Sequence, residues 1–325
     1  MVGEDLASVG QVEDVKVWKD MKVRDLVELY GRMHGFTASY VFRASQILLE
    51  GLRSSDIRFL AFTGNLVATG LRGVLAQLVD MGLFNVIVTT CGAVDHDIAR
   101  SLGGAYYKGD FDMDDAELAE KGVHRLGNVL VPRESYGVII ESYVKKLVER
   151  LASVKSSWGV RELLSEVGRD LSGDPNSVLG AAFRAGARVY VPGIVDGSFG
   201  TNLFIFSQFK KIQLDVFKDM KELADAVFSS KKSAALVIGG GISKHHTIWW
   251  NQFKGGLDYA VYITTATEWD GSLSGARTKE AVSWGKISPK AKHVTVYGDA
   301  TVVLPILVAY ILSGIGNTSP EPAHT

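Results

Sequence analysis

The chain has 325 residues, of which 46% are hydrophobic and 22% charged, as in globular proteins that bury a sizeable core. A formal net charge of −1 gives no electrostatic reason to bind nucleic acid or an anionic membrane, and a single cysteine, Cys91, excludes an intrachain disulfide framework. The acidic N-terminus lacks the layout of a signal peptide, and the apolar run at 301–315 is too short to span a bilayer. We therefore expect a cytoplasmic protein that binds neither nucleic acid nor membrane.

The first 20 residues are polar, and we expect a loose segment there. Apolar residues at helical spacing then predict helices at 23–33 and 38–52, which would form a helical N-terminal arm. After this arm, short apolar runs alternate with helical stretches. Strands are expected at 57–62, 86–88, 189–191, 234–238, 259–263 and 294–297, and helices at 66–81, 94–102 and 138–151.

This alternation favours a mostly parallel sheet that is covered by helices on both faces. No repeat or low-complexity linker divides the chain, so we predict one doubly wound, Rossmann-like α/β domain over residues 21–316. The polar tail at 317–325 is expected to be disordered. Two adjacent indoles, Trp249 and Trp250, cannot both face one core, and we expect one of them to meet a neighbouring subunit.

Several predicted strands end in small or polar residues directly before a helix. In a doubly wound sheet these ends line one crevice, where helix N-termini present free amides to phosphate groups. The segments are Thr63-Gly64-Asn65, Thr90-Cys91-Gly92, Gly239-Gly240-Gly241, Thr264-Thr265-Ala266 and Asp299-Ala300. Asp196 and Asp299 are candidate acceptors for ribose hydroxyls. The usual G-x-G-x-x-G fingerprint is absent after the first strand, and such turns are glycine-rich in every α/β protein, so a crevice without a nucleotide remains the alternative.

The stretch 268–287 carries the strongest candidate for chemistry. It opens on Glu268 and Asp270, passes through a Gly/Ser-rich loop, and continues as a short helix that ends on Trp284-Gly285-Lys286. A lysine beside an indole with few polar neighbours loses water, which disfavours the ammonium form and leaves an amine that can form an imine. The alternative is a lysine that lays its stem along Trp284 and keeps its charge in water.

Many motifs along the chain resemble those of the deoxyhypusine synthase family, in the same order and over residues 25–312. Besides the segment Ala281–Lys286, they are Gly35-Phe36-Thr37-Ala38, Thr63-Gly64-Asn65-Leu66, Tyr107-Lys108-Gly109-Asp110-Phe111, Arg125-Leu126-Gly127-Asn128, Val131-Pro132, Asp196-Gly197-Ser198, Gly239-Gly240-Gly241, Lys244-His245-His246, Asp258-Tyr259-Ala260-Val261-Tyr262 and Ser274-Gly275-Ala276-Arg277. By this resemblance the chain is identified as a member of the family, of archaeal type.

The resemblance implies NAD-dependent transfer of the 4-aminobutyl group of spermidine to one lysine of the precursor of translation initiation factor 5A. It implies that Lys286 forms the imine, that His245 is the base and that Trp284 packs along the aliphatic chain. Glu280 would hold a cationic end of spermidine, with Ser274 and Asp270 in the same substrate site. The implied NAD contacts are Asn65, Thr90, Gly92, Asp196, Gly240, Gly241, Thr265, Ala266, Asp299 and Ala300, and no metal site is expected.

Two positions depart from the family pattern on the substrate side. Thr201 and Leu273 stand where familiar members carry aspartates of the polyamine site, so that other acids must serve or the substrate differs. On the cofactor side, Cys91, Ala93 and His96 replace an alanine, a glycine and a glutamate.

Two other functions therefore stay open beside deoxyhypusine synthesis. One is homospermidine synthesis with a small amine as acceptor, and the other is an inactive NAD-binding subunit that regulates a partner. For the assembled protein we expect a homotetramer with active sites at a dimer interface.

Overall fold

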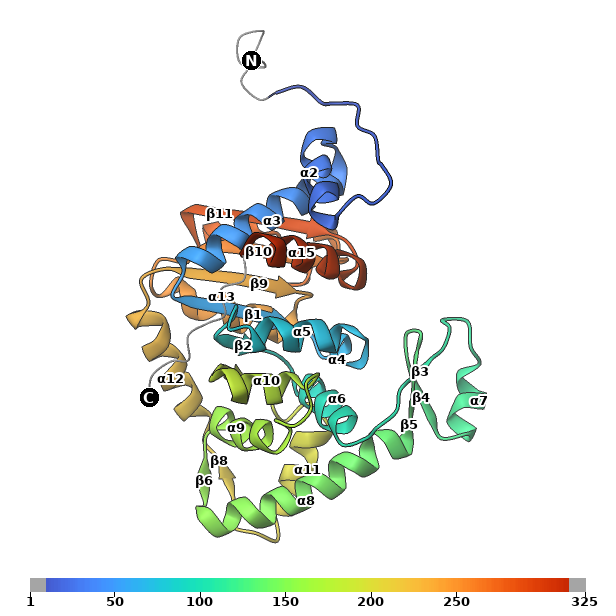
Figure 1. The fold of residues 1–325 in the computed structure, drawn as a ribbon. Coiled ribbons are helices and arrows are strands. Elements are labelled where there is room, and N and C mark those ends of the chain that lie inside the picture. Colours follow the sequence, from blue (N-terminus) through green and yellow to red (C-terminus); the bar gives the residue numbers. More distant parts are fainter. Residues whose placement is uncertain (1–9, 316–325) are drawn as a thin grey trace.

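The computed structural model describes residues 10–315, which are built around one six-stranded sheet (Figure 1). All neighbouring strands in this sheet are parallel, and they lie in the order β11-β10-β9-β1-β2-β7. Their bounds are Ile57–Phe62 for β1, Val86–Val88 for β2, Arg188–Tyr190 for β7, Ser233–Ile238 for β9, Leu257–Thr264 for β10 and Ile287–Tyr297 for β11. The predicted α/β class with a mostly parallel sheet is confirmed.

Numbered along the chain, these six strands have the spatial order 3-2-1-4-5-6. The chain thus starts at the centre of the sheet, winds to one edge, returns to the centre and winds to the other edge. Strand β1 pairs with β2 on one side, where Phe59 lies opposite Val86, and with β9 on the other, where Ile57 lies opposite Ser233. The direction of winding reverses between β1 and β9, and in open α/β sheets ligands bind beside such a reversal.

Both faces of the sheet are buried, which explains why its strands are apolar at nearly every position. Successive residues of β1 point into different cores: Leu60 and Phe62 belong to the larger one, whereas Phe59 and Ala61 belong to the smaller one. The larger core contains residues of α3, α5, α6, α8, α10 and α15, and the smaller one contains residues of α12, α13 and α14.

The helices follow the predicted alternation, with two differences in detail. The expected helix at 66–81 is interrupted at Thr69, whose hydroxyl donates to the carbonyl of Leu66 and accepts from the amide of Leu71, and two helices result. The expected helix at 94–102 already begins at Cys91. The bounds are Val23–Met33 (α2), Phe36–Ser54 (α3), Asn65–Ala68 (α4), Leu71–Asp80 (α5), Cys91–Ser101 (α6), Asp115–Glu120 (α7), Gly137–Val154 (α8), Val160–Asp170 (α9), Val178–Ala185 (α10), Ser198–Ser207 (α11), Val216–Ser229 (α12), Gly241–Gln252 (α13), Thr278–Ser283 (α14) and Ala300–Ile315 (α15), with 3₁₀ turns at Arg133–Ser135 and Glu268–Asp270.

The N-terminal helices α2 and α3 pack with the last helix, α15, at one end of the sheet (Figure 1). Residues 10–20 contain no helix or strand, and the loose segment expected there stays a prediction. The remainder of that segment and the predicted disordered tail lie outside the described residues. No helix among residues 10–315 is long and apolar enough to cross a membrane.

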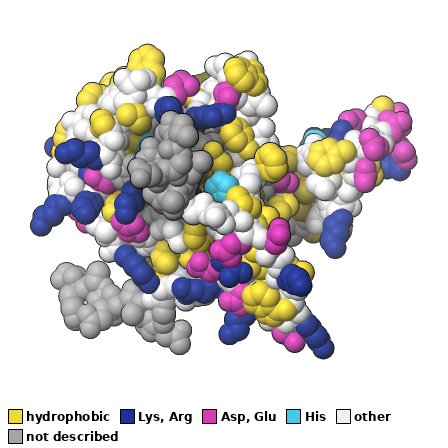
Figure 2. Space-filling view, turned by 90° about the horizontal axis from the view of Figure 1, so that it is seen from above, with side chains coloured by type: hydrophobic (Ala, Val, Ile, Leu, Met, Phe, Trp, Pro, Cys, Tyr) yellow, Lys and Arg dark blue, Asp and Glu magenta, His cyan; other side chains and the backbone are white. Residues whose placement is uncertain are grey.

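A small antiparallel sheet was not expected from the sequence. Strands β3 (Tyr107–Lys108), β4 (Val123–Leu126) and β5 (Val129–Pro132) lie in the order β3-β5-β4 and, with α7, stand out from the body of the protein (Figure 1). Acidic side chains gather at the tip of this arm (Figure 2). Two further strands of two residues each, β6 (Ser157–Trp158) and β8 (Gln213–Leu214), pair parallel with each other outside both of these sheets. The predicted single sheet therefore describes the core of the fold and not the whole chain.

Candidate active site

The ten residues predicted to contact a cofactor all follow the carboxyl ends of strands in the six-stranded sheet. Because these strands are parallel, their carboxyl ends meet at one edge, and the ten residues share that edge. They are Asn65 after β1, Thr90 and Gly92 after β2, Asp196 after β7, Gly240 and Gly241 after β9, Thr265 and Ala266 after β10, and Asp299 and Ala300 after β11.

The glycine turn after β9 lies at the centre of this edge, where the winding reverses. Gly239 has a φ of +84°, and a Cβ on it would lie 3.0 Å from the side chain of Thr63, in the loop after β1. A Cβ on Gly240 would lie 2.1 Å from the hydroxyl oxygen of Ser274, so only glycine permits this approach. Gly241 then begins α13 at an exposed position, which leaves the first amides of that helix accessible.

A cavity of about 220 Å³ lies between α13 and α14, on the face of the sheet that carries the smaller core. Four residues predicted to act on the substrate line it together: Lys286, His245, Glu280 and Trp284. Only 8% of Lys286 is exposed. Its Nζ lies 5.1 Å from the ring centroid of Trp284 and 5.9 Å from that of Trp249, so the amine is flanked by two indoles.

The end of α14 explains how the chain delivers Lys286 to this cavity. Gly285 adopts a φ of +66° just after the helix, and its amide donates to the carbonyl of Val282. The amide of Lys286 donates to the carbonyl of Ala281 at 2.9 Å, which completes a Schellman motif. Strand β11 begins at the next residue, Ile287, so the lysine is fixed between a capped helix end and a buried strand.

His245 lines the same cavity as this amine and is held as a neutral imidazole. It lies on the second turn of α13, and its ring stacks on Trp249 at 5.5 Å between centroids. Burial lowers the pKa of His245 below its ordinary value, and the positive charge of Lys286 lowers it further. Burial also lowers the pKa of the neighbouring His246 to about 4. Both imidazoles are therefore neutral at pH 7, and His245 can accept a proton there.

Among the described residues that line the cavity, Glu280 is the one with an acidic side chain. No hydrogen bond within residues 10–315 engages its carboxylate. Leu273, one of the two departures on the substrate side, lines the same cavity. Thr201 lies on α11 and does not line it. Glu268, one of the two nearest alternative acids in sequence, pairs with Arg277 and accepts from the hydroxyl of Tyr297 at 2.8 Å.

Two predicted substrate residues lie outside the cavity. Asp270 is exposed, and one of its carboxylate oxygens accepts from the amide of Ser272 at 2.7 Å. Ser274 lies against Gly240, and its carbonyl accepts from the hydroxyl of Thr264 at 3.0 Å. Ser274 thus belongs to the boundary between the cavity and the glycine turn.

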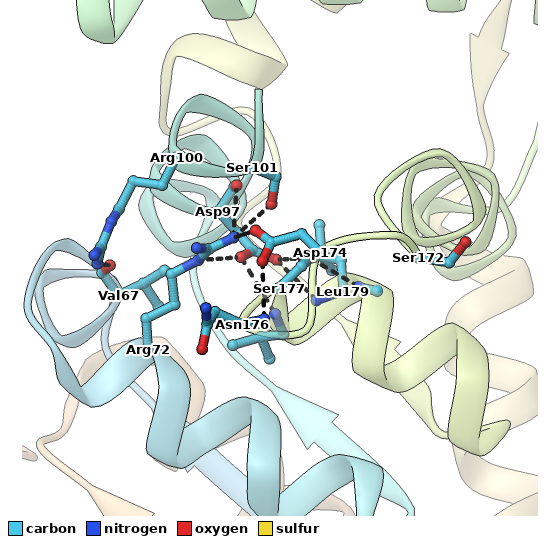
Figure 3. Close-up of polar contacts among 12 residues, drawn as sticks. Val67, Arg72, Asp97, Arg100, Ser101, Ser172, Asp174, Asn176, Ser177 and Leu179 are labelled. Atoms are coloured by element: carbon cyan, nitrogen blue, oxygen red, sulfur yellow. Dashed lines mark hydrogen bonds and ion pairs between the residues drawn. The ribbon is translucent and has the colours of Figure 1, made fainter. Parts of the chain in front are cut away.

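The loops after β1 and β2 are supported by a buried polar network (Figure 3). Asp97 of α6 accepts from Nε of Arg72 at 2.7 Å, from the hydroxyl of Ser177 at 2.9 Å and from the amide of Leu179 at 2.8 Å. One carboxylate therefore joins α5, α6 and the N-terminus of α10. This network could not be predicted from the sequence, because its members are far apart along the chain.

One turn further along α6, Arg100 donates to the carbonyls of Val67 and Thr69, at the end of α4. Helix α4 begins at Asn65 and α6 is capped at Thr90, so the two loops that carry predicted cofactor contacts are tied to each other.

His96, one of the departures on the cofactor side, faces the interior. Its Nδ1 lies 2.8 Å from the hydroxyl of Tyr106, its ring packs on Tyr136, and burial lowers its pKa to about 4. Asp299 accepts from the amide and hydroxyl of Thr301 and so caps α15, although its side chain stays exposed. Asp196 is exposed as well, beside the start of α11.

Known proteins resemble this chain along nearly its whole length. The family model for deoxyhypusine synthase matches residues 25–311. A protein of Ignicoccus hospitalis named "Probable deoxyhypusine synthase" is 58% identical over 94% of this chain and 96% of its own length. One of Sulfurisphaera tokodaii with the same name is 56% identical over 94% and 97%. The crystal structure of a "putative deoxyhypusine synthase" from Entamoeba histolytica covers 92% of this chain and 97% of its own, with a TM-score of 0.63 and 21% identity.

Matches of this extent and identity decide the family, and the fold agrees with that of the solved structure. Deoxyhypusine synthases are enzymes that transfer an aminobutyl group, and the cavity around Lys286 belongs to such an enzyme. The chain is a member of the deoxyhypusine synthase family.

Proposed function

We propose that this chain transfers the 4-aminobutyl group of spermidine to one lysine of the precursor of translation initiation factor 5A, with NAD as cofactor. The observation that carries the proposal is the buried amine of Lys286, flanked by two indoles in one cavity with a neutral His245 and the carboxylate of Glu280. This set offers an imine-forming amine, a proton acceptor and a partner for a cationic end.

The edge of the sheet fits a dinucleotide. Strands in the order 3-2-1-4-5-6 are those of the Rossmann fold, which binds its cofactor where the winding reverses. There, no other part of the chain lies within 4 Å of where a Cβ on Gly241 would be, so the backbone at the start of α13 is open to a ligand, and the first turns of α6 and α13 would present amides to a pyrophosphate. Thr265, Ala266, Asp299 and Ala300 would contact the other end of the cofactor. NAD, when bound, would accept a hydride from spermidine and return it at the end of the reaction.

The residues of the cavity would act on the remaining steps. Loss of a hydride and a proton turns the secondary amine of spermidine into an imine, and His245 is placed to accept the proton. The Nζ of Lys286 then replaces diaminopropane at the imine carbon, while Trp284 packs on the four-carbon chain and Glu280 holds its primary ammonium. The acceptor lysine replaces Lys286 in the same way, and return of the hydride and a proton leaves a secondary amine.

The assembled enzyme is proposed to be a homotetramer in which a second copy covers the cavity. Large apolar side chains at this cavity and near it are exposed in one chain: Trp284, which lines the cavity, by 65%, Trp249 by 41%, and Phe253, which packs on Trp249, by 51%. Exposed aromatic clusters of this kind favour a protein partner. Light scattering in dilute neutral buffer should give the mass of four chains, and a monomer would contradict this part of the proposal.

The function is tested by incubating the protein with NAD and spermidine labelled in its butyl part, with and without the factor 5A precursor. Label on the precursor, dependent on NAD and absent with Lys286→Arg, is the expected result. A parallel reaction contains putrescine as the acceptor. Label on putrescine alone would instead assign homospermidine synthesis, and label on neither acceptor would assign an inactive subunit.

A further inference from the structure

A second lysine also lines the cavity, directly before His245 in the chain, and its surroundings are unusual. Lys244 is only 2% exposed and ranks among the largest fully buried side chains of the described chain. Its Nζ donates to the carbonyls of Leu273 and Ala276, at 2.6 Å each, and lies 4.4 Å from the ring centroid of Tyr262. The ammonium group thus has two carbonyl acceptors and an aromatic face.

The two carbonyls belong to one turn, at 272–276, which is closed by bonds from the amides of Gly275 and Ala276 to the carbonyl of Ser272. This turn contacts the cavity on one side and the glycine turn on the other. Its residues Leu273 and Ala276 line the cavity with Lys286, whereas Ser274 between them packs against Gly240 in the glycine turn. One ammonium group therefore holds the segment that separates the cavity from the edge of the sheet.

Packing alone does not account for a lysine at this position. A buried ammonium without a carboxylate partner is costly, and a methionine of similar length would fill the space without that cost. Among the described residues no carboxylate forms an ion pair with Lys244. The other charged or titratable groups around the same cavity are Glu280, His245, Arg277, Lys286 and Tyr262. Burial lowers the pKa of Lys244 to about 8, and the charge of Glu280 opposes this shift.

We propose that Lys244 is a positioning residue: its ammonium group clamps the turn at 272–276 onto α13 and so fixes the amine cavity relative to the glycine turn. The proposal rests on the function proposed above, since that reaction needs the substrate carbon and the hydride acceptor at a fixed separation. The side chain of Lys244 lines the cavity, but its ammonium group is engaged by the carbonyls of the turn, so Lys244 acts through Leu273, Ser274 and Ala276.

Lys244→Met tests this, because it keeps the length of the side chain and removes the donor. Lys254→Met is the matched control: Lys254 follows the same helix, is partly buried and donates to the hydroxyl of Ser230 at 2.8 Å, away from the cavity. Hydrogen exchange of the peptide 272–277, measured without substrate or cofactor, reports on the clamp itself. We expect exchange there to be at least about tenfold faster in Lys244→Met, with wild-type exchange in the control.

Kinetics and binding report on positioning. For Lys244→Met, kcat/KM for spermidine should fall about 100-fold, as for a misplacement of about 1 Å, and the Kd for NAD should rise about fivefold. Lys244→Arg restores a charged donor and should recover part of both losses, which a purely packing role would not predict.

Faster exchange of the turn in Lys244→Met, together with unchanged NAD affinity and kcat/KM, would overturn the positioning role. An exchange rate equal to that of wild type would overturn it as well. If neither Lys244 variant folds, the residue is needed for the core and the proposal is also wrong. If the wild type transfers no aminobutyl group at all, the proposed function fails, and the exchange experiment still decides whether the clamp exists.

Discussion

Replacing Glu280 with glutamine should weaken spermidine binding about tenfold. The substitution keeps the size of the side chain and removes the negative charge from the wall of the cavity that contains Lys286. A charge-assisted hydrogen bond contributes about 1.5–3 kcal/mol. Glu280 is exposed in one chain, so water competes for its carboxylate, and the lower end of about 1.5 kcal/mol applies, which corresponds to about tenfold in affinity.

The assay is the KM for spermidine at pH 7 with saturating NAD, measured at low and at high salt. Salt should raise the KM of the wild type and have less effect on Glu280→Gln, because the screened attraction is already absent. Glu141→Gln is the matched control, since Glu141 is an exposed glutamate on α8 that does not line the cavity. A KM within about twofold of wild type for Glu280→Gln would refute the reasoning and place the cationic end elsewhere.

Four further outcomes are expected. Lys286→Arg should abolish transfer and borohydride trapping of labelled butylamine while NAD binding and the melting temperature persist, because a guanidinium does not deprotonate to form an imine; residual transfer at wild-type rate would contradict the mechanism. Because the pKa of His245 lies below its ordinary value of about 6.5, the imidazole NMR signals of His245 should titrate with a midpoint below 6.5, and a midpoint above 6.5 would contradict the neutral imidazole assigned to this residue. Thr201→Asp with Leu273→Asp should lower the KM for spermidine, and the single variants should assign the gain to position 273, since Leu273 lines the cavity and Thr201 does not. Asp97→Ala should destabilise the protein by about 3–5 kcal/mol, because it leaves a buried guanidinium without one of its partners, and a melting temperature equal to that of wild type would contradict the role assigned to this network.

The sequence allowed the central strands to be predicted well, because their burial on both faces produces continuous apolar runs. The bounds of β1 and β2 agree with the prediction, and β9 and β10 are each longer by one or two residues at their ends. Strand order was beyond a sequence argument, since it depends on pairing between segments as distant as Ile57 and Ser233. The arm at 107–132 was missed because its short strands are half-exposed and carry no strong apolar pattern.

The candidate site shows the same division between local and distant information. Lys286 could be singled out because Trp284 and Gly285 precede it, and glycine at that place ends a helix in a Schellman motif. Lys244 could not, because a lysine in a polar helix start is typical of a solvated surface, and its acceptors are carbonyls about thirty residues away. Which of the acids lines the cavity also depends on the tertiary fold, which brings Glu280 to its wall and pairs Glu268 with Arg277.

The order of strands has a consequence for folding during synthesis on the ribosome. Strand β1 is at the centre of the finished sheet, yet one of its two neighbours, β9, is made only when synthesis reaches residue 233. Until then, the nascent chain has β1, β2 and β7 with an apolar, unpaired edge at β1, which is the kind of edge that pairs with other chains. Pairing between such distant segments is slow to form. Mutations that slow the pairing of β9 with β1 should therefore reduce the yield of soluble protein during expression.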